Sequence, residues 1–319
     1  MQTDSVHIVT GGAGFIGSNL ARMLIERDGA DVIIVDDLSD GHKFRNIADL
    51  NIVDYIDKDD FLNLLRSDAS FAGSLQSVFH QGACSATTEW DGRYMMRNNF
   101  SYSKDVLDYC LRRNVPFIYA SSAAVYGAST EFAEAPGNEL PLNVYGYSKL
   151  LFDQYVRRLP LTAKQQVVGL RYFNVYGPRE QHKGSMASVA FHFNNQLEEN
   201  GELRLFEGSA GYADGEQLRD FVFVDDVCAV NRWFLEHRDA SGIFNVGSGK
   251  PQTFNDVANA VIDWHGNGAI SYIPFPEGLR EAYQSYTQAD LAQLRGTGCD
   301  VDFRDVASGV STYLDTLSG

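Results

Sequence analysis

A glycine-rich stretch near the start of the chain constrains the fold more than any other feature of the sequence. The stretch Thr10-Gly-Gly-Ala-Gly-Phe-Ile-Gly17 directly follows a short apolar run, Val6 to Thr10, and directly precedes a segment with helical spacing, Ala21 to Arg27. Glycines at this spacing allow a tight turn and close approach of the backbone to a pyrophosphate at a helix N-terminus. The next strand-like run, Asp31 to Asp36, completes a βαβ unit. The pattern therefore predicts a dinucleotide-binding unit at the start of the fold.

The alternation of apolar runs and helical patterns continues through the first half of the chain. Further strand-like runs lie at Ile52 to Ile56, Ser77 to His80, Val115 to Ala120 and Val167 to Tyr172, and beyond Asn174 at Leu203 to Glu207, Asp220 to Val224 and Ile243 to Gly247. This layout is typical of a doubly wound parallel sheet. We predict an α/β fold with a Rossmann-type doubly wound parallel sheet and a second, smaller mixed α/β substrate lobe.

The two predicted domains are discontinuous in the sequence, because the pattern loosens after Asn174 and strand-like runs return later. Residues 1–173, with the returning segments 220–246 and 288–319, are expected to form the dinucleotide-binding domain. Residues 174–219 and 247–287 are expected to form the substrate-binding domain.

Composition excludes several classes of partner. A formal net charge of −16 over 319 residues disfavours nucleic acid and anionic membranes. No apolar run approaches the length of a transmembrane helix, and the polar start Met1 to Ser5 does not resemble a signal peptide. Cys84, Cys110, Cys228 and Cys299 are scattered without metal-ligand spacing. We expect a cytoplasmic protein with reduced thiols and no metal site.

A second motif, Tyr145-Gly-Tyr-Ser-Lys149, places a phenol and an ammonium four residues apart, on one face of a helix. A nearby ammonium lowers the pKa of a phenol from its usual value of about 10, so that the pair can take a proton from an alcohol while hydride leaves. The same spacing also occurs on ordinary surface helices. The run Val115 to Ala120, however, leads into Ser121 to Gly127, which places hydroxyls at the carboxyl end of a strand, where such sheets bind ligands.

The residues after the second strand leave the choice of nicotinamide cofactor open. Asp36 lies where a carboxylate binds the adenosine ribose of NAD and repels the phosphate of NADP. Lys43 and Arg45 follow in the same loop, and either cation could pair with that phosphate or simply be solvated.

With the glycine loop, Ser122, Tyr145 and Lys149, the chain resembles the extended short-chain dehydrogenase/reductase (NAD-dependent epimerase/dehydratase) family, in particular members that modify sugar nucleotides. Three stretches are similar to the ADP-glycero-manno-heptose 6-epimerases of that family: Gln81 to Gly92, Arg171 to Met186 and Phe206 to Ser209. The similarity extends through almost the whole chain.

This resemblance implies Ser122, Tyr145, Lys149 and Lys183 as catalytic residues and NADP as a tightly bound, recycled cofactor. The implied cofactor-binding residues are Gly11, Gly14, Phe15, Ile16, Gly17, Asp36, Asp37, Lys43, Lys58, Gln81, Gly82, Ala83, Cys84, Ser85, Asn98, Tyr145, Lys149, Val175 and Lys183. The implied substrate-binding residues are Asn174, Ser185, His192, Phe206, Glu207, Gly208, Ser209, Arg219 and Tyr283. The expected partner is an ADP-heptose, and the resemblance implies a homo-oligomer, with a pentamer as one state.

The implied reaction is inversion of carbon 6, from ADP-D-glycero-manno-heptose to ADP-L-glycero-manno-heptose, for lipopolysaccharide core heptose supply. Tyr145 removes the proton of the carbon-6 hydroxyl while hydride passes to the nicotinamide. Carbon 6 lies outside the sugar ring, so rotation about one bond presents the other face of the ketone, and hydride returns from the same cofactor. Lys183 is expected to handle the proton on the second side, with His182 as the competing candidate.

Several residues have ordinary structural alternatives. Lys58 could be a solvated charge and Asn98 a helix-surface amide. The set Asn174, Ser185, His192 and Tyr283 could fill core or satisfy backbone groups. Arg219 suits a substrate diphosphate, or else an ion pair with Asp220 or Glu216.

One stretch departs from the heptose epimerases: Ala210 to Leu218 is longer and more acidic than expected. If Tyr212 to Gln217 is a peripheral insertion, shortening it should change turnover only a few-fold. A hundredfold loss would instead show that it lines the site.

Rival functions of the same fold are a sugar-nucleotide dehydratase, another sugar-nucleotide epimerase, an NADP-dependent reductase and a cofactor-sensing regulator. A dehydratase needs an acid and a base just after the serine, where this chain has Ala123 and Ala124. The intact Ser122, Tyr145 and Lys149 argue against a regulator without chemistry.

Overall fold

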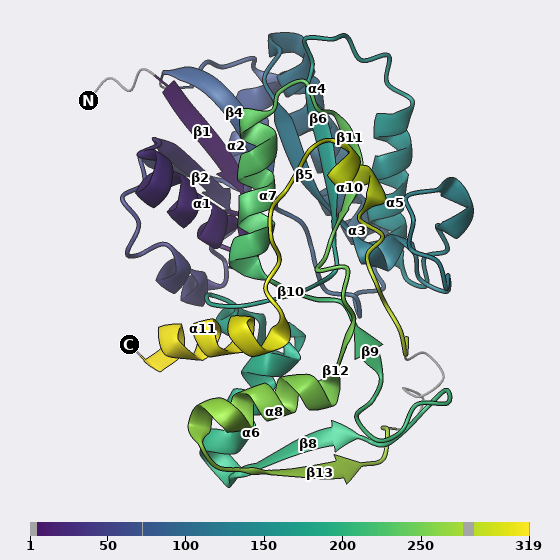
Figure 1. Cartoon of the computed structure of the whole chain (residues 1–319). Helices are drawn as coiled ribbons and strands as arrows, with labels where there is room; N and C mark the ends of the chain where they lie inside the picture. Colours follow the sequence, from purple (N-terminus) through teal and green to yellow (C-terminus); the bar gives the residue numbers. More distant parts are fainter. Residues whose placement is uncertain (1–4, 72, 277–283, 319) are drawn as a thin grey trace.

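The computed structural model describes residues 5–71, 73–276 and 284–318, and its larger part is a seven-stranded parallel sheet between two layers of helices (Figure 1). The strands are β1 (Ser5–Thr10), β2 (Val32–Asp36), β3 (Asp54–Asp57), β4 (Ser74–His80), β5 (Phe117–Ser122), β6 (Val167–Tyr172) and β11 (Gly242–Val246). Their order is β11-β6-β5-β4-β1-β2-β3, so the direction of winding reverses between β1 and β4. In such sheets the ligand crevice lies at this reversal, outside the carboxyl ends of the strands. The predicted doubly wound α/β fold is confirmed.

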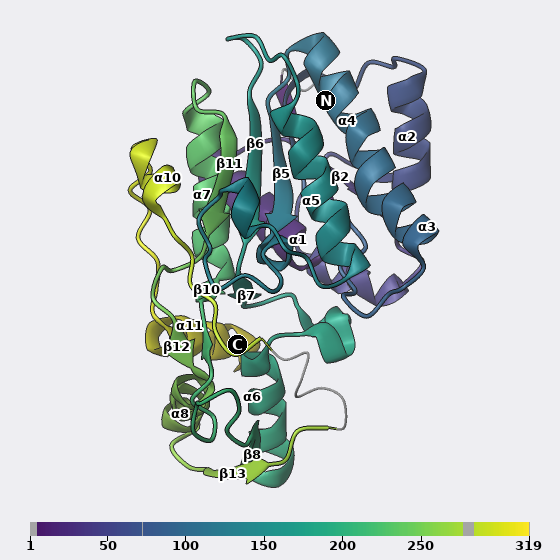
Figure 2. The ribbon, with the colours of Figure 1, turned by 90° about the vertical axis from the view of Figure 1, so that its right-hand side faces the viewer.

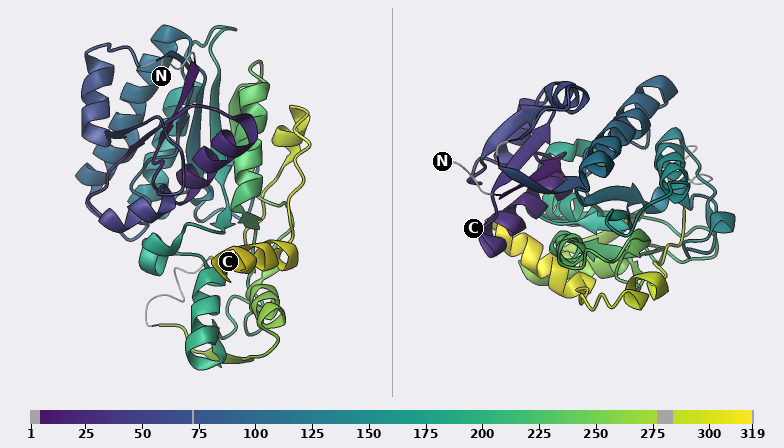
Figure 3. Two further views of the ribbon diagram at one scale, coloured as in Figure 1. Left: turned by 90° about the vertical axis from the view of Figure 1, so that its left-hand side faces the viewer. Right: turned by 90° about the horizontal axis from the view of Figure 1, so that it is seen from above.

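Two apolar cores hold the helices on the sheet. Helices α1 (Phe15–Asp28) and α7 (Val224–Glu236) cover one face, and α2 (Lys58–Arg66), α4 (Tyr102–Arg113) and α5 (Val144–Arg157) cover the other, as Figures 2 and 3 show. All five residues of β2 are buried. Strands covered on both faces are expected to read as such continuous apolar runs. This is why the first half of the sequence could be divided into strands by inspection.

The second lobe lies below the carboxyl ends of the strands in Figure 1. Strands β8 (Glu202–Phe206) and β13 (Ala269–Ile273) pair in parallel, and the helices α6 (Val189–Asn200), α8 (Phe254–His265) and α11 (Val306–Ser318) pack together beside them. Helix α8 begins with a capping box in which Thr253 and Asp256 satisfy each other's backbone N–H groups.

Short strand pairs join the two parts. β7 (Asn174–Tyr176) pairs with β10 (Phe221–Phe223) in parallel, and β9 (Leu218–Arg219) pairs with β12 (Gln252–Thr253) in antiparallel fashion. The small helix α10 (Ala292–Gly296) returns to lie beside β11.

The last helix, α11, packs in a different lobe from the one to which it was assigned by sequence. Residues 288–319 were assigned to the dinucleotide-binding domain, but Val306, Val310 and Leu314 of α11 are buried in the core of the second lobe, with Val261 of α8. An apolar stripe indicates that a helix buries one face but not which partner covers it, so the periodicity of α11 did not indicate which core it joins.

Within the described ranges, no helix is both long enough and apolar enough to cross a bilayer.

Candidate active site

Ser122, Tyr145 and Lys149 come together at the carboxyl end of β5. Ser122 is the last residue of that strand, and its hydroxyl is hydrogen-bonded to the phenol of Tyr145, in the first turn of α5. Lys149 follows one turn later, and its Nζ donates to the carbonyl of Ala120 at 2.7 Å. The side chains of the sequence motif therefore converge on the end of the strand that precedes it.

Local geometry explains why α5 begins so close to Ser122. The side chain of Asn143 caps the helix by accepting from the Gly146 N–H at 2.8 Å. A Cβ atom at Gly146 would lie only 2.5 Å from the carbonyl oxygen of Ala124, in the turn after Ser122. Glycine in the second position of Tyr145-Gly-Tyr-Ser-Lys149 thus lets α5 pack closely against that turn.

The protonation of the pair differs from the expectation. Burial raises the pKa of Tyr145, and only the hydrogen bond with Ser122 offsets this rise. The predicted lowering by Lys149 is wrong for this structure, because the ammonium is directed at the Ala120 carbonyl. Burial also lowers the pKa of Lys149, to about 8, while the Asp153 carboxylate acts in the opposite direction.

The glycine loop fits a dinucleotide. Gly11 has a φ of 64°, and a Cβ atom there would lie 2.6 Å from backbone atoms of Gly82, in the loop after β4. Gly14 is the N-cap of α1 and Phe15 its first residue, so a helix N-terminus faces this narrow turn. A turn without side chains before a helix N-terminus is the donor arrangement that a pyrophosphate needs.

The two adjacent acids at the end of β2, Asp36 and Asp37, are each paired with a lysine. Asp36 accepts from the Ala13 N–H at 2.8 Å and from Lys43 Nζ at 2.6 Å. Asp37 pairs with Lys58 at 2.8 Å, and this hydrogen bond holds the pKa of Asp37 well below its usual range. Lys43 and Lys58 are therefore not merely solvated charges, and they put two cations at the position expected for the adenosine ribose.

Lys183 lies next to the glycine loop. It belongs to the 3-10 turns of Gln181–Met186, and its Nζ lies 5.2 Å above the centre of the Phe15 ring. Burial lowers the pKa of Lys183. His182 has a different task, because its Nδ1 accepts from the Asn46 amide at 3.0 Å, and Asn46 also donates to the Ala13 carbonyl at 2.9 Å.

A polar residue that sequence reasoning missed, Asn99, joins the loop after β4 to α5. The Asn99 side chain bonds the N–H of Cys84 at 2.8 Å and its carbonyl at 2.9 Å, and donates to the hydroxyl of Ser148 at 3.0 Å. Asn98, which was predicted, donates to the Tyr94 carbonyl within its own helix. Asn99 lies in a π-helical segment, Met96–Ser101, and its side chain is buried, whereas Asn98 is partly exposed.

His80 was also missed, although it ends β4. Its ring is fully buried, with Nδ1 2.7 Å from the Thr10 hydroxyl and Nε2 2.8 Å from the Ser103 hydroxyl. Ser103 donates to the Asn99 carbonyl, so it accepts from Nε2–H, and Nδ1 then accepts from Thr10. Burial lowers the pKa of His80 to about 3. A neutral imidazole therefore ties the start of the glycine loop to α4.

The predicted substrate residues are distributed over the second lobe and its junction with the sheet. Phe206 ends β8 and stacks on Phe275, with ring centres 4.6 Å apart. Arg219 Nη1 donates to the Leu218 carbonyl at 2.9 Å, and the guanidinium lies 5.7 Å above the Phe254 ring. Of the other predicted substrate residues, Asn174 and Ser185 are exposed, His192 is partly exposed on α6, and Tyr283 lies outside the described residues. Val175, which was predicted to bind the cofactor, packs against the sheet core.

A family model described as the NAD dependent epimerase/dehydratase family matches residues 7–247, which is more than half of the chain. The chain belongs to the NAD dependent epimerase/dehydratase family. The family predicted from the motifs is thereby confirmed.

Individual members of this family match nearly the whole chain. The ADP-L-glycero-D-manno-heptose-6-epimerase of Alkalilimnicola ehrlichii is 62% identical over 311 residues, which are 98% of this chain and 97% of that protein. The crystal structure of the Helicobacter pylori ADP-L-glycero-D-manno-heptose-6-epimerase matches with a TM-score of 0.84 and 32% identity, covering 100% and 97% of the two chains. The UDP-glucose 4-epimerase of Thermus thermophilus, solved in complex with NAD, matches with a TM-score of 0.79 and 27% identity, covering 98% and 99%.

The long acidic loop of this family member is not a peripheral insertion. Gln217 is buried, and its amide donates to the carbonyl of Glu207 at 2.9 Å. The Asp214 carboxylate accepts from the Gly208 N–H at 2.7 Å. The loop therefore holds the backbone of residues 207–209, part of the predicted substrate segment.

We expect Gln217→Leu to lower the free energy of unfolding by about 1–3 kcal/mol, because the buried side chain of Gln217 loses its part-buried hydrogen bond to the Glu207 carbonyl. Ala213→Ser, on the exposed part of the same loop, is the control and should leave it unchanged. Urea unfolding of the three proteins measures the effect. Equal stability of all three would show that the Gln217 hydrogen bonds contribute nothing.

Proposed function

We propose that this protein inverts carbon 6 of an ADP-linked heptose, converting ADP-D-glycero-manno-heptose into ADP-L-glycero-manno-heptose with NADP that stays bound and is recycled. The observation that carries the reaction class is the convergence of Ser122, Tyr145 and Lys149 beside a glycine turn that fits a dinucleotide. The 62% identity with the Alkalilimnicola ehrlichii enzyme over almost the full length supports the substrate.

Two residues transfer protons, Tyr145 on one side of the substrate and Lys183 on the other. A bound nicotinamide supplies the hydride acceptor and donor. Tyr145 takes the proton of the carbon-6 hydroxyl, while Ser122, already bonded to that phenol, holds the reacting oxygen. Lys149 supplies a positive charge beside them. Once the carbon-6 ketone has rotated, Lys183 donates a proton to its oxygen from the other side of the substrate.

Rival reactions fit the described side chains less well. The positions after Ser122 that a dehydratase uses for its acid and base hold Ala123 and Ala124, whose methyl groups cannot transfer protons. A reductase remains distinguishable by experiment, because it would consume its cofactor in proportion to product.

The test is to incubate the purified protein with either heptose epimer in D₂O, without added cofactor, and to follow the configuration at carbon 6 by NMR. We expect both epimers to reach the same mixture, with no deuterium at carbon 6, since the hydride returns from the position that received it. Loss of water from the sugar, or turnover only with added NADPH, would contradict the proposal.

The cofactor preference makes a separate prediction. We expect NADP to bind more tightly than NAD, because Lys43 and Lys58 place two ammonium groups beside Asp36 and Asp37. Lys43→Met should reduce the preference at least about tenfold, since a hydrogen bond to a charged group contributes about 1.5–3 kcal/mol. Competition binding of the two cofactors to both proteins measures this, with the exposed Arg45→Met as the control. Equal or tighter binding of NAD to the parent would overturn the assignment of NADP.

A further inference from the structure

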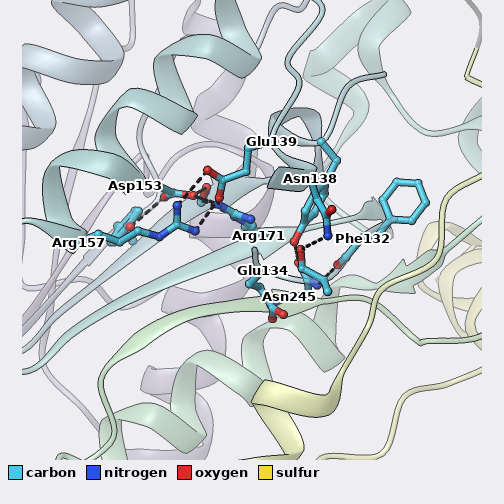
Figure 4. Close-up of polar contacts among 12 residues, drawn as sticks. Phe132, Glu134, Asn138, Glu139, Asp153, Arg157, Arg171 and Asn245 are labelled. Atoms are coloured by element: carbon cyan, nitrogen blue, oxygen red, sulfur yellow. Dashed lines mark hydrogen bonds and ion pairs between the residues drawn. The ribbon is translucent and has the colours of Figure 1, made fainter. Parts of the chain in front are cut away.

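A buried ion cluster (Figure 4) links helix α5, which carries Tyr145 and Lys149 of the proposed catalytic trio Ser122, Tyr145 and Lys149, to strand β6. Arg171 of β6 is fully buried, and its guanidinium binds the carboxylates of Asp153 and Glu139. Glu139 also receives both ends of the Arg157 guanidinium, at 2.9 and 2.6 Å. Burying charges costs several kcal/mol per ion unless they are well paired. The cluster therefore carries a desolvation cost that its ion pairs must offset. Its two carboxylates, those of Asp153 and Glu139, have different hydrogen-bond partners.

Asp153 ties the catalytic helix to the strand that carries Ser122. Its carboxylate accepts from the Tyr119 phenol, the Ser121 hydroxyl and Arg171 Nε, each at 2.9 Å. Ser121 is the residue before Ser122 in β5 and pairs with Arg171 across the sheet. One buried carboxylate therefore connects α5, β5 and β6, and on β5 it binds the residue next to Ser122.

Asp153 follows Lys149 by one helical turn on α5, so the two side chains lie on the same face of that helix. The groups around Lys149 come from three further elements and from its own helix: the Ala120 carbonyl of β5, the neutral His80 of β4, Cys84 of the loop after β4, and Tyr145 and Asp153 of α5. Of the groups just named, Asp153 alone has a carboxylate side chain. Burial favours loss of the Lys149 proton, and the charge of Asp153 opposes that loss.

We propose that Asp153 is a positioning residue for the trio: its carboxylate holds α5 against β5 and keeps Lys149 as an ammonium during catalysis. The proposal rests on the proposed function, because it assumes that Lys149 works in its charged form beside Tyr145. Arg171 in turn pairs with the buried carboxylate of Asp153.

The cluster itself offers a matched pair of variants. Asp153→Asn and Glu139→Gln each remove one carboxylate charge from Arg171 with little change of shape, but only Asp153 is on the helical turn after Lys149. A role limited to stability predicts similar effects of the two changes. A role in positioning and charging Lys149 predicts different pH profiles.

The measurement is the pH dependence of kcat/KM for epimerisation. Activity falls as pH rises through the pKa of Lys149, so a lower pKa moves this alkaline limb to lower pH. For Asp153→Asn we expect a shift of about one pH unit, the lower end of the effect of a neighbouring charge, and so about a tenfold loss on that limb. For Glu139→Gln the limb should stay in place. An unmoved limb in Asp153→Asn, or an equal shift in both variants, would overturn the proposal.

A direct titration separates this proposal from the proposed function. The pKa of Lys149 can be followed by NMR of ¹³C-labelled lysine, with Lys149→Met to assign the signal, whether or not the protein epimerises the heptose. If the unpaired Arg171 prevents Asp153→Asn from folding, the double variant Asp153→Asn/Arg171→Gln removes both charges. A smaller downward shift is then expected, because the loss of the cation partly offsets the loss of the carboxylate. If the pKa of Lys149 in the variant equals that in the parent protein, the role of Asp153 is refuted, even if epimerisation itself is confirmed.

Discussion

Tyr145→Phe is expected to lower the rate of epimerisation about 10³-fold or more, within the range of about 10²–10⁴ that a general acid or base contributes. The phenol is the group that bonds Ser122 at the end of β5, and phenylalanine keeps the ring while removing the proton acceptor. The rate is measured in both directions by NMR at saturating substrate.

Tyr147→Phe is the matched control for this change. Tyr147 lies on the same helix two residues later, and its side chain is 48% exposed, so the variant should retain the parent rate within about twofold. Cofactor content and thermal unfolding of both variants should equal those of the parent. Substantial epimerisation by Tyr145→Phe would mean that another group takes the carbon-6 proton.

Lys183→Met is expected to lower epimerisation at least about 100-fold in both directions, the low end for removal of a general acid or base. After the carbonyl has rotated, its oxygen points away from Tyr145, and a second proton donor is needed. The structure holds the Lys183 ammonium over the Phe15 ring, and burial lowers its pKa toward neutrality, which makes proton transfer easier in either direction.

His182→Ala distinguishes this role from a general effect on the loop. His182 accepts from Asn46, which supports the glycine turn, so its loss should affect stability while turnover stays within about tenfold. Cofactor binding to Lys183→Met should be measured in parallel, because the same change removes the contact with Phe15. If Lys183→Met interconverted the epimers within about tenfold of the parent rate, the scheme with two proton-transfer groups would be wrong.

The strands of the large sheet could be predicted because their signal is local. A parallel strand covered on both faces needs an uninterrupted apolar run, and the predicted run Val167 to Tyr172 is β6 residue for residue. Helix α11 was assigned to the wrong lobe because an amphipathic stripe indicates a buried face without indicating its partner. Asn99 was missed for a related reason: the sequence does not indicate which of two adjacent asparagines is buried.

The sequence by itself determined the glycine turn and the shared helical face of Tyr145 and Lys149, because both depend on spacings within one turn of the chain. Only the tertiary structure decided the charges of that site. Lys149 donates to Ala120, 29 residues before it, and Asp153 binds Arg171 from another strand, and neither contact follows from local spacing. A pKa reports burial and the direction of nearby charges, which exist only after distant segments have packed together. The sequence could therefore predict which residues meet at the candidate site, whereas it could not predict their protonation.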